Sequence, residues 1–310
     1  MAETMATRQA YGKTLIELGE KYPQLVVMDA DLSKSTMTAE FGKTYPDRFF
    51  NMGIAEQNLY GAAAGLALSG KIVCASTFAM FATGRAFEII RNSIGYTRAN
   101  VKICATHAGI TVGEDGASHQ TFEDIALMRT IPGMTVINPS DGVSAKKLLE
   151  QAVAMEGPCY VRLGRAKVPV FYEDSDQLTL GKGNLVKDGK DVTIVATGIM
   201  VSEAMAAAEK LKKDGIDARI IDIHTIKPID EEILIKAAQE TGAIVTAEEH
   251  SIIGGLGSAV AEVIVKNCPV KMAMVGQKDT YGESGKPDEL KKKYGMTAED
   301  IEAAVKNLIG

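Results

Sequence analysis

The sequence contains no tryptophan and only four cysteines and four histidines in 310 residues. The cysteines are far apart and form neither a CxxC pair nor a Cys/His pattern with the spacing of metal ligands. Three of them sit inside apolar, strand-like runs. These features argue against a disulfide framework or a zinc site, and they predict small buried thiols in a reducing compartment. The four residues are Cys74, Cys104, Cys159 and Cys268.

The sequence also lacks a membrane-spanning run and a dense basic tract. Between Gln57 and Gly84 the only charged residue is Lys71, but glycine and alanine dominate this segment and Lys71 divides it, so we expect a buried helix and a buried strand. The first residues lack the apolar core of a signal peptide. The formal net charge of −6 argues against nucleic acid as the main partner. We therefore expect a cytoplasmic protein that binds neither membrane nor nucleic acid.

Three common catalytic signatures are missing as well: the Walker A sequence, the GxSxG nucleophile elbow and HExxH. Polar residues nevertheless gather where predicted strands end, without an evident nucleophile among them. Such a set suggests a polyhydroxylated or phosphorylated ligand, with the hard chemistry supplied by a cofactor.

The pattern of apolar runs predicts an α/β protein with two doubly wound domains. Strand and helix patterns alternate through residues 1–172, which indicates a mainly parallel sheet covered by helices on both faces. Residues 173–190 change to a polar, glycine-containing composition and are predicted to be a linker or a small hairpin. The alternation resumes in residues 191–310, which are expected to form the second domain.

A glycine-rich loop from His107 to Gln120 is the most informative stretch. It follows the predicted strand Val101–Ala105 and contains His107, His119, Glu114 and Asp115. Glycine lets a backbone turn tightly and aim several polar groups into one space, so the loop suits a ligand site at a strand end. Because loops are polar in general, an ordinary connecting loop stays open as the alternative.

Other candidate positions also allow two interpretations. Glu56 comes at the start of a very apolar predicted helix, where it could complement the helix dipole or serve as a partly buried acid that exchanges protons. Ser33 and Ser35 follow a buried strand and suit either a ligand site or a helix cap. Phe78 and Phe81 are three residues apart, so we expect them to share one face of a helix that opens at Thr77. His224 and His250 are predicted to be structural.

Five segments taken together resemble the carboxyl-terminal half of transketolase. The resemblance covers essentially the whole chain, and we expect a pyrimidine-binding domain followed by a transketolase C-terminal domain. Each segment alone would be a weak signal, but all five occur in the family's order. They are Gly53-Ile-Ala-Glu56-Gln-Asn, Ser76-Thr-Phe-Ala-Met-Phe81, Thr106-His107-Ala-Gly-Ile, Gly113-Glu-Asp115-Gly-Ala-Ser-His119-Gln and Ile137-Asn-Pro-Ser-Asp141.

The resemblance implies a thiamine diphosphate enzyme that transfers a two-carbon ketol unit from a ketose phosphate to an aldose phosphate. Glu56 would hydrogen-bond the aminopyrimidine ring and promote the tautomer that activates the thiazolium. Phe78 and Phe81 would pack against that ring. His107 and His119 would assist proton transfer, as imidazoles can near neutral pH. The residues implied to bind the sugar hydroxyls and the phosphate are His107, Asp115, His119, Arg8, Ser35 and Arg165.

Two departures from the family stand out. Gly84 occupies a position where many relatives carry a third aromatic residue. The Gly-Asp-Gly…Asn motif, which in the family's amino-terminal half holds the metal ion and the diphosphate, is not found in these 310 residues. We therefore expect a separate amino-terminal-half subunit that holds Mg²⁺ or Ca²⁺, in a heterotetramer with two copies of each chain (α₂β₂).

The same resemblance leaves other functions open. The chain could be the beta subunit of the first component of a 2-oxo acid dehydrogenase, or a detached half of deoxyxylulose-phosphate synthase. It could also be a scaffold that keeps the fold without the reaction. His107, Asp115 and His119 favour a sugar phosphate, and the presence of Glu56 argues against the scaffold.

Overall fold

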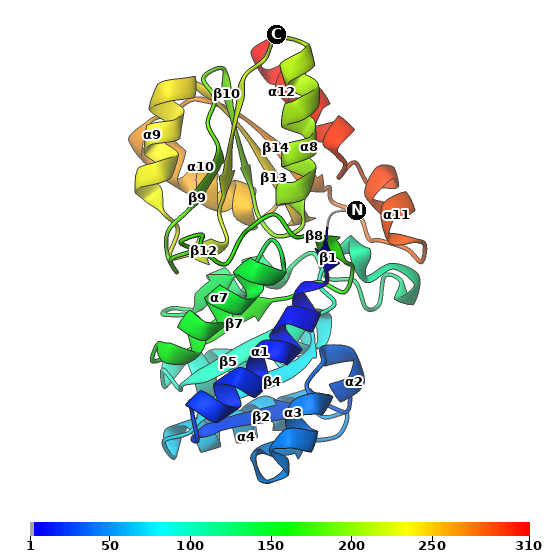
Figure 1. The fold of residues 1–310 in the computed structure, drawn as a ribbon, viewed down its shortest axis with the longest axis vertical. Coiled ribbons are helices and arrows are strands. Elements are labelled where there is room, and N and C mark those ends of the chain that lie inside the picture. Colours follow the sequence, from blue (N-terminus) through cyan, green and yellow to red (C-terminus); the bar gives the residue numbers. More distant parts are fainter. Residues whose placement is uncertain (1–2) are drawn as a thin grey trace.

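Two sheets, one in each of two stacked domains, organise residues 3–310, which are the residues that the computed structural model describes (Figure 1). The first sheet has seven strands in the order β12-β6-β7-β5-β4-β2-β3. All neighbours in it run parallel except β12, which pairs antiparallel with β6. Its strands are β2 (Leu25–Asp29), β3 (Phe49–Asn51), β4 (Ile72–Phe78), β5 (Val101–Thr106), β6 (Thr135–Ile137), β7 (Cys159–Arg162) and β12 (Thr225–Lys227).

The central strands of this sheet are buried along their whole length, as expected for a parallel sheet covered on both faces. One face packs against α1 (Thr7–Lys21), α3 (Ala39–Thr44) and α7 (Gly142–Ala154). The other face packs against α4 (Glu56–Leu68), the π-helical segment η3 (Ile90–Tyr96) and α6 (Asp124–Arg129). The remaining short helical segments are α2 (Ser33–Thr36), η1 (Pro46–Arg48), η2 (Phe81–Arg85), α5 (Phe87–Ile89) and the 3₁₀ segment η4 (Ile110–Asp115).

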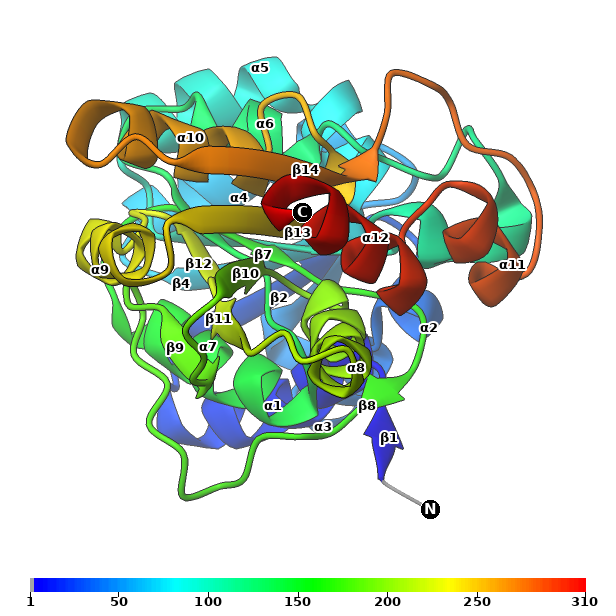
Figure 2. The same ribbon diagram turned by 90° about the horizontal axis from the view of Figure 1, so that it is seen from above.

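The second sheet has five strands in the order β14-β13-β10-β11-β9, of which only β9 is antiparallel to its neighbour. Helices α8 and α12 cover one face and α9 and α10 the other, as the view from above shows (Figure 2). Its elements are β9 (Asn184–Lys187), β10 (Val192–Ala196), α8 (Met200–Lys213), β11 (Ala218–Asp222), α9 (Glu231–Thr241), β13 (Ala243–Ser251), α10 (Leu256–Asn267), β14 (Lys271–Gln277), α11 (Pro287–Lys293) and α12 (Ala298–Ile309).

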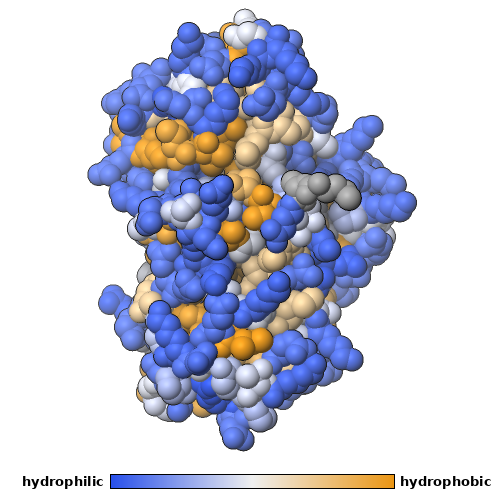
Figure 3. Space-filling model, viewed as in Figure 1, coloured by the Kyte–Doolittle hydropathy of each residue, from blue (hydrophilic) through white to orange (hydrophobic). Residues whose placement is uncertain are grey.

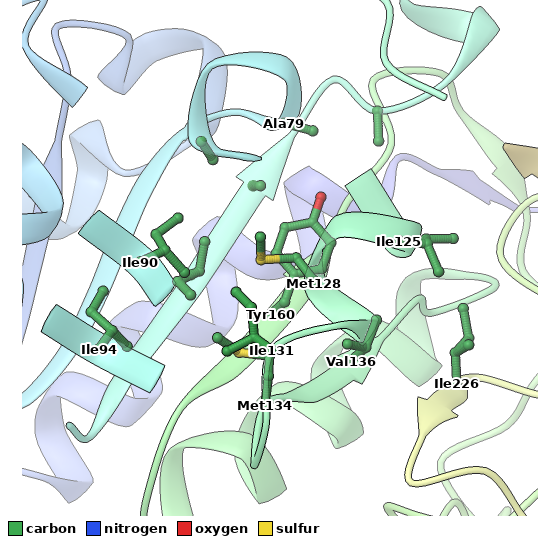
Figure 4. Close-up of a cluster of buried hydrophobic side chains, with 14 of the residues drawn as sticks. Ala79, Ile90, Ile94, Ile125, Met128, Ile131, Met134, Val136, Tyr160 and Ile226 are labelled. Carbon is green, nitrogen blue, oxygen red and sulfur yellow. The ribbon is translucent and has the colours of Figure 1, made fainter. Parts of the chain in front are cut away.

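The two domains share more than a linker. Strand β12 lies within the range expected for the second domain, yet it forms the edge of the first sheet. Its Ile226 belongs to the apolar cluster that also contains Ile125 and Val136 of the first domain (Figure 4). A third sheet, of two strands, pairs β1 (Thr4–Met5) with β8 (Val168–Pro169). Residues 173–190, expected as a linker, contribute β9 to the second sheet.

Hydrophilic residues cover most of the face shown in Figure 3, and apolar area forms separate patches across the upper domain, near the junction and on the lower domain. None of the helices in residues 3–310 has both the length and the apolar character that a membrane crossing requires.

One predicted element differs from the structure. The prediction that a helix begins at Thr77 is wrong, because β4 continues to Phe78, which still pairs with Thr106 of β5. The predicted helix type is wrong as well. The segments that follow, η2 and η3, are π-helical. Apolar spacing cannot distinguish a π-helical turn from an α-helical one, and such turns often occur at functional sites.

His224, at the junction between β11 and β12, predicts a pH dependence of stability. Burial lowers its pKa to about 4, and its Nε2 has no hydrogen-bond partner in residues 3–310. The unfolded chain takes up the proton near pH 6.5 whereas the folded chain does not, so stability present above that pH is lost as pH falls towards 4. We expect His224→Met to lose less unfolding free energy than the wild type between pH 7 and pH 5 in urea titrations. Equal losses would contradict this role.

Candidate active site

The carboxyl ends of β4 and β5 place four rings together. Because the two strands pair up to Phe78 and Thr106, Phe78 lies beside His107, and the rings of Phe78 and His107 stack with their centroids 3.8 Å apart. Phe81, on η2, stacks 6.0 Å from Phe78. The ring of His119 meets Phe78 and Phe81 edge-on at 6.1 and 5.2 Å. We refer to Phe78, Phe81, His107 and His119 as the aromatic cluster.

Glu56 lies beside this cluster, in the first turn of α4, and is only 2% exposed. Nη1 of Arg85 donates to both of its carboxylate oxygens at 3.0 Å. The same guanidinium lies over the ring of Phe81, 4.4 Å from the centroid. The Arg85 side chain is 50% exposed, so the acid is shielded from water while its cationic partner is not. Glu56 is thereby connected to the aromatic cluster through a single side chain on the solvent side.

His107 is held in an unusual backbone conformation, with φ at +57°. Its Nδ1 shares a 2.8 Å hydrogen bond with the hydroxyl of Thr106, and the residue is buried. Burial lowers the pKa of His107 to about 3, helped by the positive charges of Arg8 and Arg165. The imidazole is therefore neutral near pH 7, and with Nδ1 engaged it can use Nε2 to hold a hydroxyl group.

Arg8 and Arg165 bring two positive charges to the same side of His107. Nη1 of Arg8 donates to the carbonyl of Ser35 at 2.6 Å, and its Nε is buried without a partner in residues 3–310. Burial and the nearby Arg165 lower the pKa of Arg8. Arg165 donates to the carbonyl of Val112 and pairs with Glu114 at 2.9 Å. A bound anion would relieve the repulsion between the two cations and satisfy the free donor.

The structure thus brings nearly all predicted site residues into one region at the ends of β4 and β5. Asp115 belongs to the same loop but differs from the others, because it lies exposed at the end of η4 and makes no side-chain hydrogen bond within residues 3–310. His224 and His250, predicted to be structural, lie elsewhere and are fully buried. Nδ1 of His250 donates to the carbonyl of Ser251 at 2.7 Å.

Arg85 is a site residue that was not predicted from the sequence. A weak signal for it existed, because Arg85 follows Phe81 by four residues and helical residues at that spacing share a face. Its pairing with Glu56, 29 residues earlier in the sequence, could not be deduced from spacing. Only the packing of η2 against α4 brings the two side chains together.

The residues suit the pyrimidine end of thiamine diphosphate. A buried carboxylate and a flat apolar surface are what an aminopyrimidine ring requires, and Glu56 and Phe81 supply them, with Arg85 in contact with both. At Gly84 an added Cβ would lie only 2.6 Å from Cε of Met80, so the end of the methionine side chain lies directly against this glycine. For the diphosphate end, residues 3–310 contain no group of three or more His, Cys, Asp or Glu side chains arranged to hold a metal ion.

This combination of two α/β domains and a buried acid beside an aromatic cluster defines a pyrimidine-binding domain joined to a C-terminal domain. Residues 3–170 match the family described as transketolase, pyrimidine binding domain, and residues 181–301 match transketolase, C-terminal domain. The chain therefore belongs to the transketolase family, a family of transferases, and corresponds to the carboxyl-terminal half of these enzymes. The predicted fold class and family are confirmed. Membership in this family implies thiamine diphosphate as the cofactor.

Individual relatives agree with this assignment. The chain is 57% identical over 297 residues to a transketolase C-terminal section from Methanocaldococcus jannaschii, covering 95% of this chain and 93% of that protein. It is 38% identical to mouse transketolase over 313 residues, which covers 100% of this chain but 50% of the mouse enzyme. A solved structure described as a split gene transketolase, inactive beta4 tetramer, has 54% identity and a TM-score of 0.91, with 98% of both chains covered.

The pair formed by Glu56 and Arg85 can be tested by a double-mutant cycle. Because Glu56 is buried and Arg85 is half exposed, we expect Arg85→Met alone to lower the free energy of unfolding by about 1–2 kcal/mol, mostly from the unpaired carboxylate. Adding Glu56→Gln should recover most of this loss. Urea unfolding of the wild type, both single variants and the double variant measures the coupling. Strictly additive effects would show that the pair contributes nothing.

Proposed function

We propose that the chain is the carboxyl-terminal subunit of a split, thiamine-diphosphate-dependent transketolase. It would transfer a two-carbon ketol unit between a ketose phosphate and an aldose phosphate. The observation that carries this proposal is an unbroken series of contacts from Glu56 through Arg85, Phe81 and Phe78 to His107. One end of the series, Glu56, suits the cofactor's ring, and the other end, His107, lies near two arginines. Ketol transfer between phosphorylated sugars requires both kinds of group in one site.

Each part of this series has a separate task in the proposed reaction. When bound, thiamine diphosphate supplies the electron sink that lets a carbon–carbon bond next to a carbonyl break. Glu56 holds the ring nitrogen of the pyrimidine and shares a proton with it. Phe78 and Phe81 give the ring an apolar surface and exclude water. Arg85 must release Glu56 for this contact, which its half-exposed position allows.

The substrate lies, in this proposal, along the side formed by His107, His119, Arg8 and Arg165. His107 holds a sugar hydroxyl as a neutral ring, and His119 assists proton transfer. Arg8 and Arg165 hold the phosphate, because guanidinium groups bind phosphate oxygens through paired, charge-assisted hydrogen bonds. Two further residues complete this side. Ser35 lies beside Arg8, whose guanidinium donates to its carbonyl, and the exposed side chain of Asp115 becomes ordered when it contacts the substrate.

A second subunit completes the site. We infer that an amino-terminal-half partner holds Mg²⁺ or Ca²⁺ and the diphosphate, and that two copies of each chain assemble. The related split-gene transketolase described as an inactive beta4 tetramer supports this inference, since that assembly contains one kind of chain and is inactive. A cytoplasmic location fits the scattered, unpaired cysteines.

The choice of sugar is a separate question, on which two further relatives bear. The chain is 44% identical to a 6-deoxy-6-sulfo-D-fructose transketolase subunit from Clostridium. It is 41% identical to one of the chains of an apulose-4-phosphate transketolase from Phocaeicola vulgatus. Both names specify a sugar with an anionic group. The two arginines suit such a group in this chain, and we propose a phosphate.

Reconstitution tests the proposed function directly. The chain alone should show no ketol transfer, and activity should appear when a partner subunit with the Gly-Asp-Gly…Asn motif is added with Mg²⁺ and thiamine diphosphate. Glu56→Gln should assemble normally in gel filtration but lose nearly all turnover, about 10²-fold or more for a group that shares a proton. Full activity of the chain alone would overturn the split-site proposal, and ordinary turnover of the variant would remove Glu56 from the reaction.

Arg165→Ala should separate phosphate binding from the chemistry. Removing one guanidinium should raise the KM for a phosphorylated donor by about tenfold or more, because a charge-assisted hydrogen bond contributes roughly 1.5–3 kcal/mol. The KM for hydroxypyruvate, which carries no phosphate, should change little. Lys167→Ala, a nearby cation outside the proposed site, provides the control. Equal effects on both donors would place Arg165 away from the phosphate.

A further inference from the structure

The loop from His107 to Gln120 is shaped by the second domain. Its three glycines have positive φ values, and atoms of the second domain occupy the space beside each of them. An added Cβ at Gly109 would overlap the carboxyl group of Glu249, and one at Gly116 would overlap the hydroxyl of Ser284. At Gly113 it would lie 3.3 Å from the carbonyl oxygen of residue 285. The glycines therefore allow the backbone of the loop to turn, and they also let the second domain pack closely against it.

Glu249, near the end of β13, makes the most direct contact. Its Oε1 accepts a 2.6 Å hydrogen bond from the backbone N–H of Thr111, in the first turn of η4. The carbonyl of the next residue, Val112, accepts a hydrogen bond from Nη1 of Arg165. A side chain of the second domain thus fixes the short backbone segment that in turn holds one of the two candidate phosphate-binding arginines.

Glu249 is itself fixed from behind. Nη2 of Arg162 donates to its backbone carbonyl at 2.8 Å, and Arg162 pairs with Asp124 in a fully buried contact at 2.7 Å. On the far side of the loop, Nε2 of Gln120 donates to the carbonyl of Glu283 at 2.9 Å. The loop is therefore held by the second domain at both ends, whereas its middle, with Glu114 and Asp115, stays exposed.

We propose that Glu249 is a positioning residue for substrate phosphate: by holding the N–H of Thr111 it keeps the Val112 carbonyl, and with it Arg165, in place. This assigns to the second domain a task in substrate recognition, and it rests on the proposed function. Glu249 touches neither the substrate nor the aromatic cluster in this arrangement. Its loss should raise the KM for phosphorylated donors and leave kcat and the use of hydroxypyruvate nearly unchanged.

Three substitutions of Glu249 test this in the reconstituted enzyme. Glu249→Leu removes the acceptor, and we expect about a tenfold rise in KM for a phosphorylated donor, since loss of a single buried hydrogen bond of this kind amounts to about one order of magnitude. Glu249→Gln keeps an acceptor oxygen and should restore the KM to within about twofold of wild type. Glu249→Asp keeps a carboxylate but makes the side chain shorter by one methylene, so that the acceptor no longer reaches Thr111. We expect it to raise the KM as Glu249→Leu does, and it provides the test if Glu249→Leu folds poorly.

Glu248→Leu is the matched control. Glu248 is also a buried carboxylate of β13, but within residues 3–310 it accepts hydrogen bonds only from the backbone of Leu256 and Gly257, in its own domain, at 2.6 and 2.8 Å. General weakening of the second domain would affect both sites, whereas positioning of Arg165 would affect only the Glu249 variants. A ratio of KM values for phosphorylated and unphosphorylated donors that stays at the wild-type value in Glu249→Asp and Glu249→Leu would overturn the inference. Absence of ketol transfer in the wild-type complex would instead overturn the proposed function.

Discussion

The buried ion pair between Asp124 and Arg162 is the contact on which the rest of the structure depends. Nε of Arg162 lies 2.7 Å from Oδ2 of Asp124, and neither side chain is more than 3% exposed. Tyr160 donates a further 2.6 Å hydrogen bond to the same carboxylate. Burial by itself would raise the pKa of Asp124, but the neighbouring cation holds that pKa below its usual value. Removing either partner would leave an uncompensated charge in the interior, which is costly.

The position of this pair explains how the two domains are connected. Asp124 begins α6 and Arg162 ends β7, and the guanidinium reaches across to the backbone of Glu249 in the second domain. Close to it, His250 accepts a hydrogen bond from the backbone of Ala126. Strand β12 also forms the edge of the first sheet, so both polar and apolar contacts connect the two domains. The glycine-rich loop of the site lies between these contacts, so its shape belongs to the junction and not to one domain.

The candidate site is strongly asymmetric in charge. The side proposed for the cofactor offers one buried carboxylate, and the side proposed for the substrate offers two guanidinium groups near a neutral imidazole. In the proposed reaction an anionic sugar would meet the cations, whereas the acid lies apart from them, beyond the aromatic cluster. This separation prevents Glu56 from pairing with Arg8 or Arg165, which would neutralise the groups proposed to hold the cofactor and the phosphate. In the isolated chain Arg85 pairs with Glu56, and its half-exposed position lets the guanidinium move away into solvent.

The sequence by itself determined the fold class, the family and most of the candidate site residues, because buried parallel strands require continuous apolar runs and the family's motifs are local in sequence. Phe78, His107 and Arg165 could be named without coordinates for that reason. Their mutual geometry was decided by tertiary structure alone. The pairing of Arg85 with Glu56, the crossing of β12 into the first sheet and the hold of Glu249 on Thr111 all join residues far apart in the sequence. No periodicity encodes such contacts, since they arise only when separate elements pack against one another.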